Sequence, residues 1–167
     1  MYKIFSLCML ALCFHGCSTS TSTGTSESTE LTSIPLELTT HLGDQQLFVE
    51  GDEIQFLLSI GQDAYVYMIY IDASDNITLI LPNPNQHSHF YSAGYFLTIP
   101  EYENLYRFTI SEPFGEETIW VFASDQSITL DQSLGDIESI KKKIKQSSMK
   151  TYGEYSLRIT TREKSRL

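Results

Sequence analysis

Residues 64–71 read AYVYMIYI, and residues 117–123 read ETIWVFA. Both stretches are rich in β-branched and aromatic residues, which favour β-strands. Both are also nearly continuous in apolar residues, as in strands whose two faces are both covered by other parts of a protein. We therefore predict that each forms an interior strand of a sheet.

Shorter strands are predicted on both sides of these two stretches, because apolar residues alternate with polar ones and Gly, Pro, Asn and Asp stand between the segments. The predicted strands are residues 34–38 (an edge strand containing Pro35), 54–60, 77–81, 105–110 and 155–159. Closely spaced strands with turn signals predict a mainly β fold. The expected architecture is an antiparallel β-sandwich, and the immunoglobulin-like sandwich is one form that it could take.

One C-terminal amphipathic helix is predicted at about residues 133–148. Residues 133–136 (SLGD) resemble a capping box, which marks the start of a helix. Leu134, Ile137, Ile140 and Ile144 recur at helical spacing and form a narrow apolar stripe. With this helix, residues 34–167 are expected to form a single β-rich domain.

The first sixteen residues have the pattern of a cleaved export signal. Lys3 supplies a positive charge, and the apolar run of residues 4–14 is too short to span a bilayer, which needs roughly 20 residues. The following CFHGC segment resembles the lipobox of bacterial lipoproteins. Gly16 fits that pattern, whereas Phe14 is larger than the usual Leu and His15 is not small. The resemblance implies a signal peptide at residues 1–16 and lipid modification of Cys17.

Residues 17–33 follow as a segment rich in Ser and Thr. Such a composition cannot bury enough apolar surface to offset the entropy lost on ordering, so a flexible tether is expected. The lipobox resemblance also implies a location. Ser18, rather than Asp, follows the cysteine, which implies sorting to the outer membrane, with the domain facing the periplasm.

The charges divide the chain into an acidic part and a basic end. The net charge is -10, which argues against a nucleic-acid partner because phosphates require basic patches. Nine of the eleven Lys and Arg residues lie in residues 141–167. This basic end could contact anionic lipid, an acidic partner or the acidic body of its own domain.

A family resemblance extends over residues 51–124. GDEIQFLLSIGQDAYVYMIYID, NITLILPNP, AGYFLTIP and SEPFGEETIWVFAS occur in the order and spacing of the family called domain of unknown function 4384. The resemblance implies a β-rich extracytoplasmic domain, often found in lipoproteins or attached to larger envelope proteins. It implies no enzymatic activity, cofactor or site residue.

No motif for catalysis or metal binding is recognised. All three cysteines lie within residues 1–17, which leaves the domain without a thiolate nucleophile or ligand. His87 and His89 could share a zinc ion, but a polar loop is the simpler interpretation. The same holds for the Asp72, Asp75 and Asn76 loop as a calcium site. Acidic pairs such as Glu116 and Glu117 are expected to be solvated at the mouths of strands.

Aromatic residues give the best candidates for a binding site. Tyr91, Tyr95, Phe96 and Tyr102 lie in the middle loops, and exposed aromatics are typical of contacts with proteins or sugars. Packing in the core is the alternative for the same residues. The sequence therefore predicts a non-catalytic binding or assembly module on a lipid anchor, with an envelope protein as partner. A domain that binds glycans or small ligands is the alternative.

Overall fold

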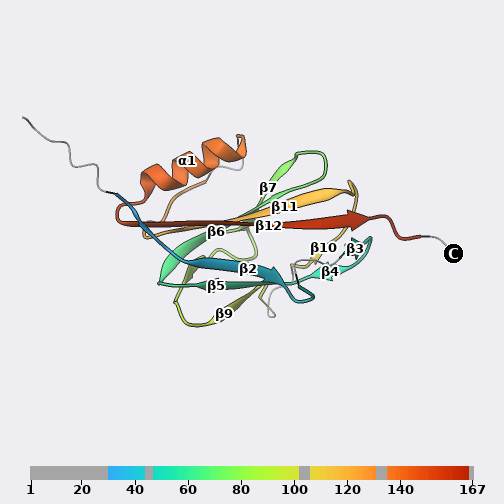
Figure 1. Cartoon of the computed structure of the whole chain (residues 1–167), viewed down its shortest axis with the longest axis horizontal. Helices are drawn as coiled ribbons and strands as arrows, with labels where there is room; N and C mark the ends of the chain where they lie inside the picture. Colours follow the sequence, from blue (N-terminus) through green and yellow to red (C-terminus); the bar gives the residue numbers. More distant parts are fainter. Residues whose placement is uncertain (1–29, 44–46, 102–105, 131–134, 166–167) are drawn as a thin grey trace, which may run out of the picture.

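The computed structural model of the chain describes residues 30–43, 47–101, 106–130 and 135–165 (Figure 1). The predicted signal peptide and Cys17 lie outside these ranges. The described residues form twelve strands and one helix, which confirms the mainly β fold and the single helix near the C-terminus.

A sheet of seven strands forms the middle layer of the domain. Its main path runs through β1 (Thr32–Ser33), β12 (Thr151–Arg162), β11 (Glu116–Ser124), β6 (Ala64–Ile71) and β7 (Ile77–Leu81). Two short strands extend it: β3 (Leu47–Val49) pairs with β12, and β8 (Phe90–Tyr91) pairs with β6. Both β6 and β11 have hydrogen-bonded neighbours on each side, so the prediction that they are interior strands is confirmed.

A smaller sheet packs on one face of the large sheet and completes a sandwich. It consists of β2 (Leu36–Thr40), β5 (Phe56–Ile60) and β9 (Phe96–Ile99), and β4 (Glu53–Ile54) pairs with β10 (Phe108–Thr109) beside it. Alternate residues of β5 are buried, and they belong to the same core as alternate residues of β6 and β11. Phe56 and Leu58, for example, share this core with Val121 and are fully excluded from solvent.

The helix α1 (Ile137–Ser147) covers the opposite face of the large sheet (Figure 1). Its buried residues, Ile140 and Ile144, pack in a second core with side chains that β6 and β11 project on that face, such as Tyr67 and Phe122. Because successive residues of a strand point to opposite faces, β6 and β11 supply both cores at once. This explains their two-sided apolar sequences.

Polar contacts hold α1 at the sheet as well. Lys141 Nζ lies 2.8 Å from Glu154 Oε1 on β12 and 5.4 Å from the centre of the Trp120 ring. The Tyr152 hydroxyl donates to Glu154 Oε2 at 2.6 Å. Partial burial acts to raise the pKa of Glu154, but the bonds from Lys141 and Tyr152 hold it below its usual value. Glu154 therefore remains a carboxylate that joins helix and strand.

The first strand, β1, lies within the segment that the sequence assigns to the tether. The tether was predicted to reach Ser33, whereas Thr32–Ser33 form β1 and pair in parallel with the start of β12. Thr32 N donates to the Lys150 carbonyl (2.8 Å), and Ile34 N donates to the Tyr152 carbonyl (2.9 Å). This close approach requires Gly153, because a Cβ there would lie 2.5 Å from the Ile34 carbonyl oxygen.

Other differences concern the ends of elements. The last strand is longer than predicted and spans Thr151–Arg162, and β3 and β8 were not predicted. Two of the pairings, β1 with β12 and β3 with β12, are parallel, so the large sheet is mixed rather than wholly antiparallel. The helix begins at Ile137, with Asp136 as its N-cap accepting from Ser139 N (2.9 Å), so the predicted start at residue 133 was too early.

Candidate functional site

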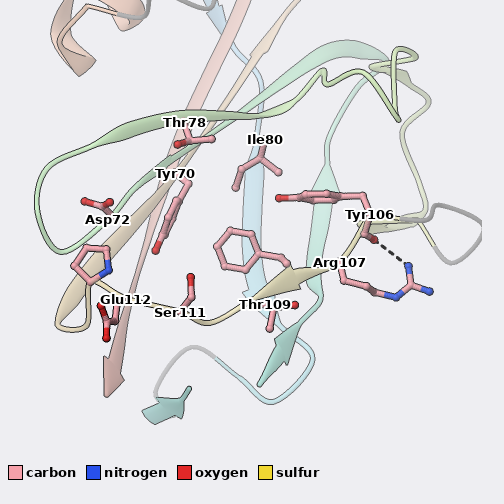
Figure 2. Close-up of a pocket in the computed structure, with 11 residues that line it drawn as sticks. Tyr70, Asp72, Thr78, Ile80, Tyr106, Arg107, Thr109, Ser111 and Glu112 are labelled. Carbon is pink, nitrogen blue, oxygen red and sulfur yellow. Dashed lines mark hydrogen bonds between the residues drawn. The ribbon is translucent and has the colours of Figure 1, made fainter. Parts of the chain in front are cut away.

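A polar pocket of about 220 Å³ opens at one end of the sandwich, beside β10 and the hairpin that joins β6 to β7 (Figure 2). The aromatic side chains of Tyr70, Tyr106 and Phe108 line it, together with polar side chains that include Asp72, Arg107 and Ser111. The Phe108 ring is fixed by edge contacts with Tyr70 (5.0 Å between ring centres) and Phe56 (5.3 Å). The pocket wall is therefore continuous with the core.

Asp72 in this pocket is engaged by its own loop. Its Oδ1 accepts hydrogen bonds from Ser74 N (2.8 Å) and Asn76 N (2.9 Å), and its Oδ2 accepts from Asn76 Nδ2 (2.8 Å). Burial acts to raise the pKa of Asp72, but these hydrogen bonds together lower it below its usual value. The arrangement is that of a hairpin turn stabilised by an Asp side chain. No cluster of three metal-ligating side chains occurs among the described residues.

A buried carboxyl lies behind the Tyr70 side of the pocket. Glu117 is only 1 % exposed, and its Oε1 accepts from Thr161 Oγ1 at 2.7 Å. Its Oε2 is buried without a hydrogen bond of ordinary geometry in the described part of the chain. Burial raises the pKa of Glu117, and the Tyr70 and Thr161 hydroxyls act in the opposite direction. The expectation that Glu116 and Glu117 are both solvated is wrong for Glu117.

The surroundings of the pocket also shift the pKa values of its two tyrosines, Tyr70 and Tyr106. Burial raises the pKa of the Tyr70 hydroxyl, and the neighbouring Glu117 and Asp72 carboxyls raise it further. Burial also raises the pKa of Tyr106. Both phenols therefore stay protonated at neutral pH and can act only as neutral hydrogen-bonding groups toward a ligand.

A larger groove of about 430 Å³ lies at the small sheet, along β2. It is lined by Leu36, Glu37, Leu38, Thr39, Leu57, Phe96 and Tyr155. Phe96 is 77 % exposed, and its neighbour Tyr95 is 73 % exposed. Glu37 is the one charged side chain among the residues that line this groove. The groove is therefore an open surface of mixed polarity, on which the exposed Phe96 ring is the main apolar feature.

The structure separates the four aromatic candidates of the sequence. Tyr95 and Phe96 are exposed side chains at the start of β9, as a binding site requires. Tyr91 packs against the sandwich core instead, and its hydroxyl accepts from Gln86 Nε2 at 2.7 Å. Burial, together with the nearby charge of Glu101, raises the pKa of Tyr91 to about 12. Tyr102 lies outside the described residues.

The two histidines of the predicted loop have different surroundings. His87 is exposed, whereas the His89 ring packs against Tyr65 and Tyr67, at 5.4 and 5.1 Å between ring centres. His89 Nδ1 donates to the His87 carbonyl (3.1 Å), and its Nε2 is buried without a hydrogen-bond partner in the described part of the chain. His89 is thus a packed aromatic residue rather than a member of a polar surface loop.

Sequence reasoning did not bring the pocket residues together, because they come from segments far apart in the chain. Tyr70 belongs to β6, and Tyr106 stands 36 residues later. The burial of Glu117 could have been predicted, because Glu117 is two and four positions before the buried Ile119 and Val121 on β11. Every second residue of a strand points to the same face, so Glu117 points to the same buried face as these two residues.

Comparisons with known proteins give a match to a family model over part of the chain. No curated protein matches the chain, and no solved structure matches it. The immunoglobulin-like form of the sandwich therefore stays a prediction. No helix within the described ranges is long and apolar enough to cross a membrane. The family resemblance seen in the sequence is confirmed: residues 47–127, just under half of the chain, match the family model described as Domain of unknown function (DUF4384).

Proposed function

We propose that this protein is a membrane-anchored envelope lipoprotein whose domain acts as a non-catalytic binding or assembly module, accessory to an envelope or secretion complex. Its location would be the outer membrane, with the domain facing the periplasm. The observation that carries the binding role is the exposed Phe96 ring at the edge of an open groove.

The groove has the properties of a protein-binding surface. A Phe that is 77 % exposed keeps most of its apolar surface in water, and a partner that covers it gains the free energy of removing that surface from water. Tyr and other large aromatics, placed near a pocket, often dominate the binding energy of protein interfaces. Tyr95 and Phe96 lie together next to a cavity that could receive a partner side chain. These features favour a protein partner.

The anchor rests on the sequence. The apolar run of residues 4–14 followed by Gly16 and Cys17 supports lipid modification, and multiple acyl chains on one cysteine would make the attachment durable. A module held at the membrane needs no catalytic group of its own. Its task would be to keep a partner, or a part of a complex, near the membrane.

A photo-crosslinking amino acid at position 95 tests the binding surface in living cells. A specific crosslinked product is expected from this position. The second substitution Phe96→Ala should weaken that product about tenfold, the typical effect of removing an interface aromatic. Leu42→Ala is the matched control, because Leu42 is an exposed apolar residue (53 %) that does not line the groove. Equal crosslinking with and without Phe96 would refute the groove as the contact surface.

The pocket of Figure 2 supports a second function, the binding of a glycan or small ligand. Its combination of aromatic rings with Asp72, Arg107 and Ser111 suits a polyhydroxylated ligand, although its volume of about 220 Å³ is below the roughly 300 Å³ at which small-molecule sites begin. Titration with soluble envelope glycan fragments tests this function. Saturable binding that Tyr106→Ala removes, and Phe96→Ala does not, would favour the ligand-binding role over the protein-binding one.

A further inference from the structure

We infer that the lysine-bearing outer side of α1 lies against the anionic headgroups of the membrane that holds the chain, so that the groove beside Phe96 faces away from that membrane. This inference deepens the proposed function, on whose lipid anchor at Cys17 it rests. It concerns which side of the domain the anchor presents to lipid, and which side it leaves open to a partner.

The first argument is the distribution of charge along the helix. Between Ser139 and Gly153 the chain carries five lysines and no acidic residue. Ile140 and Ile144 define the buried side of α1, and Lys142 is two positions from each of them, which places it on the outer side. Lys142, Lys143, Lys145 and Lys150 are all exposed. The exposed Met149 (64 %) adds an apolar side chain next to them.

The acidic groups near these lysines are largely engaged in the fold. Glu154 is paired with Lys141, and Asp136 caps the far end of the helix. The Asp125 carboxylate accepts from the backbone N–H groups of Met149 (2.9 Å) and Lys150 (2.8 Å). Glu138 and Glu30 are exposed, as are Asp136 and Glu154. The stretch from Ser139 to Gly153 therefore carries a local excess of positive charge on a chain whose net charge is -10.

The second argument is the place where the anchored segment joins the domain. β1 begins at Thr32, whose N–H donates to the carbonyl of Lys150 (2.8 Å). The chain from Cys17 therefore enters the domain directly beside the last of these lysines, at the C-terminal end of α1 (Figure 1). Residues 18–31 span at most about 50 Å when fully extended. Anchoring at Cys17 would thus keep the lysine-bearing end of the domain within about 50 Å of the lipid surface.

The two arguments act in the same direction. An anionic surface attracts basic groups within about one Debye length, ~8–10 Å, and repels acidic ones. The tether joins the domain at its basic end. This end can therefore turn toward the lipid without stretching the tether around the domain. α1 and the small sheet cover opposite faces of the large sheet, so this orientation directs β2, β5 and β9 away from the membrane (Figure 1).

Lysine footprinting on vesicles tests the orientation. Cys8→Ser and Cys13→Ser leave Cys17 as the single thiol of the full chain, which is then coupled to a maleimide phospholipid. Vesicles of phosphatidylcholine alone are compared with vesicles containing 30 per cent phosphatidylglycerol, and acetylation of each lysine is followed by mass spectrometry. Chemical coupling makes the result independent of lipidation in the cell. The orientation of the domain and the lipidation of Cys17 are therefore tested by separate experiments, and either can fail without the other.

We expect the four lysines to react roughly fivefold more slowly on the anionic vesicles, the factor that corresponds to attraction of a single basic residue to such a surface. High salt should abolish the difference. Lys164, beyond the opposite end of β12, serves as internal control and should react at the same rate on both vesicles. Equal rates for the helix lysines on both vesicles, or equal slowing of Lys164, would overturn the inference.

Two matched triple variants distinguish the effect of the α1 lysines from the effect of the total charge of the protein. Replacement of Lys142, Lys143 and Lys145 by Gln should return Lys150 to the reactivity seen on neutral vesicles. Replacement of Arg158, Arg162 and Lys164 by Gln removes the same charge from β12 and the residues after it, and should leave Lys150 slow. All six side chains belong to residues that are exposed, and circular dichroism checks that both variants are folded. Loss of the slow reaction in both variants, or in neither, contradicts the orientation by α1.

Discussion

At the scale of single residues, Glu117 is the most unusual position in the domain. Its carboxyl is buried inside a β-sandwich with one firm hydrogen bond, from Thr161, and its pKa is raised chiefly by burial. An acid whose folded-state pKa exceeds its unfolded-state value stabilises the fold below the unfolded value. That stabilisation is lost as the pH rises through the folded value. Glu117 therefore makes the domain less stable at neutral pH than in mild acid.

Glu117→Gln tests this linkage. The amide keeps the shape of the side chain but cannot ionise, so the variant should have a higher free energy of unfolding than the wild type at pH 8. This advantage should shrink toward pH 4, where the wild-type carboxyl is protonated. Urea unfolding at both pH values measures the effect, and Glu116→Gln, at the exposed neighbour, is the control. A difference between Glu117→Gln and wild type that is the same at both pH values would be inconsistent with a raised pKa.

Gly153 is a second position at which the structure requires one particular residue, in this case glycine. A Cβ at this position would lie 2.5 Å from the Ile34 carbonyl oxygen, a backbone atom that cannot move away without disturbing the β1 pairing. Gly153→Ala should lower the free energy of unfolding by about 1–3 kcal/mol, as overpacking typically does. Gly135→Ala is the matched control because its Cβ would meet Ser139 Cβ at an ordinary 3.7 Å. Urea unfolding measures both variants. Equal stability would show that the close contact between position 153 and the Ile34 carbonyl does not affect the free energy of unfolding.

At the scale of elements, the sequence predicts best where the pattern is local. The predicted bounds of β6 and β7 agree with the structure, because their apolar runs end at turns that contain Gly61, Asp72 and Asn83. The short strands β1, β3 and β8 could not be predicted. Each has two or three residues and exists because a longer strand offers it an edge, which is information from the tertiary structure.

The candidate site was less predictable than the fold. Exposure of Tyr95 and Phe96 agrees with their proposed role, whereas Tyr91 turned out to pack against the core. All three are aromatics in or beside turns, and composition alone cannot separate exposed from packed ones. The partners of the groove residues, such as Leu57 and Tyr155, come from strands about 40 to 60 residues away in the sequence.

Hydrogen exchange provides a test of the interior elements. The backbone amides of β6 and β11 lie in strands paired on both sides and covered on both faces, so they should exchange among the slowest in the domain. The amides of β10, a strand of two residues, should exchange faster by at least tenfold. Rapid exchange in β6 or β11, measured by mass spectrometry, would contradict the central place of these strands.

At the scale of the whole molecule, the expected anchor decides where the domain acts. Cys17→Ala should abolish labelling by a palmitate analogue and leave the protein soluble or unprocessed, because the acyl chains need the thiol. Membrane fractionation and in-gel detection of the label measure both effects. Cys13→Ala is the control, since that cysteine precedes the expected cleavage site. Labelling of the Cys17→Ala protein at the wild-type level would rule out Cys17 as the modified residue.

The parallel pairing of β1 with β12 also has a mechanical consequence. If a partner pulls the domain while the chain ahead of β1 is held, the tension runs along the axis of β1. The bonds from Thr32 N to Lys150 O and from Ile34 N to Tyr152 O lie across that axis, so they are loaded together in shear rather than broken one after another as in unzipping. Beyond Ile34 the same tension passes to β2, whose five residues are paired with β5. The domain would thus be connected to the expected tether by a pairing that resists tension.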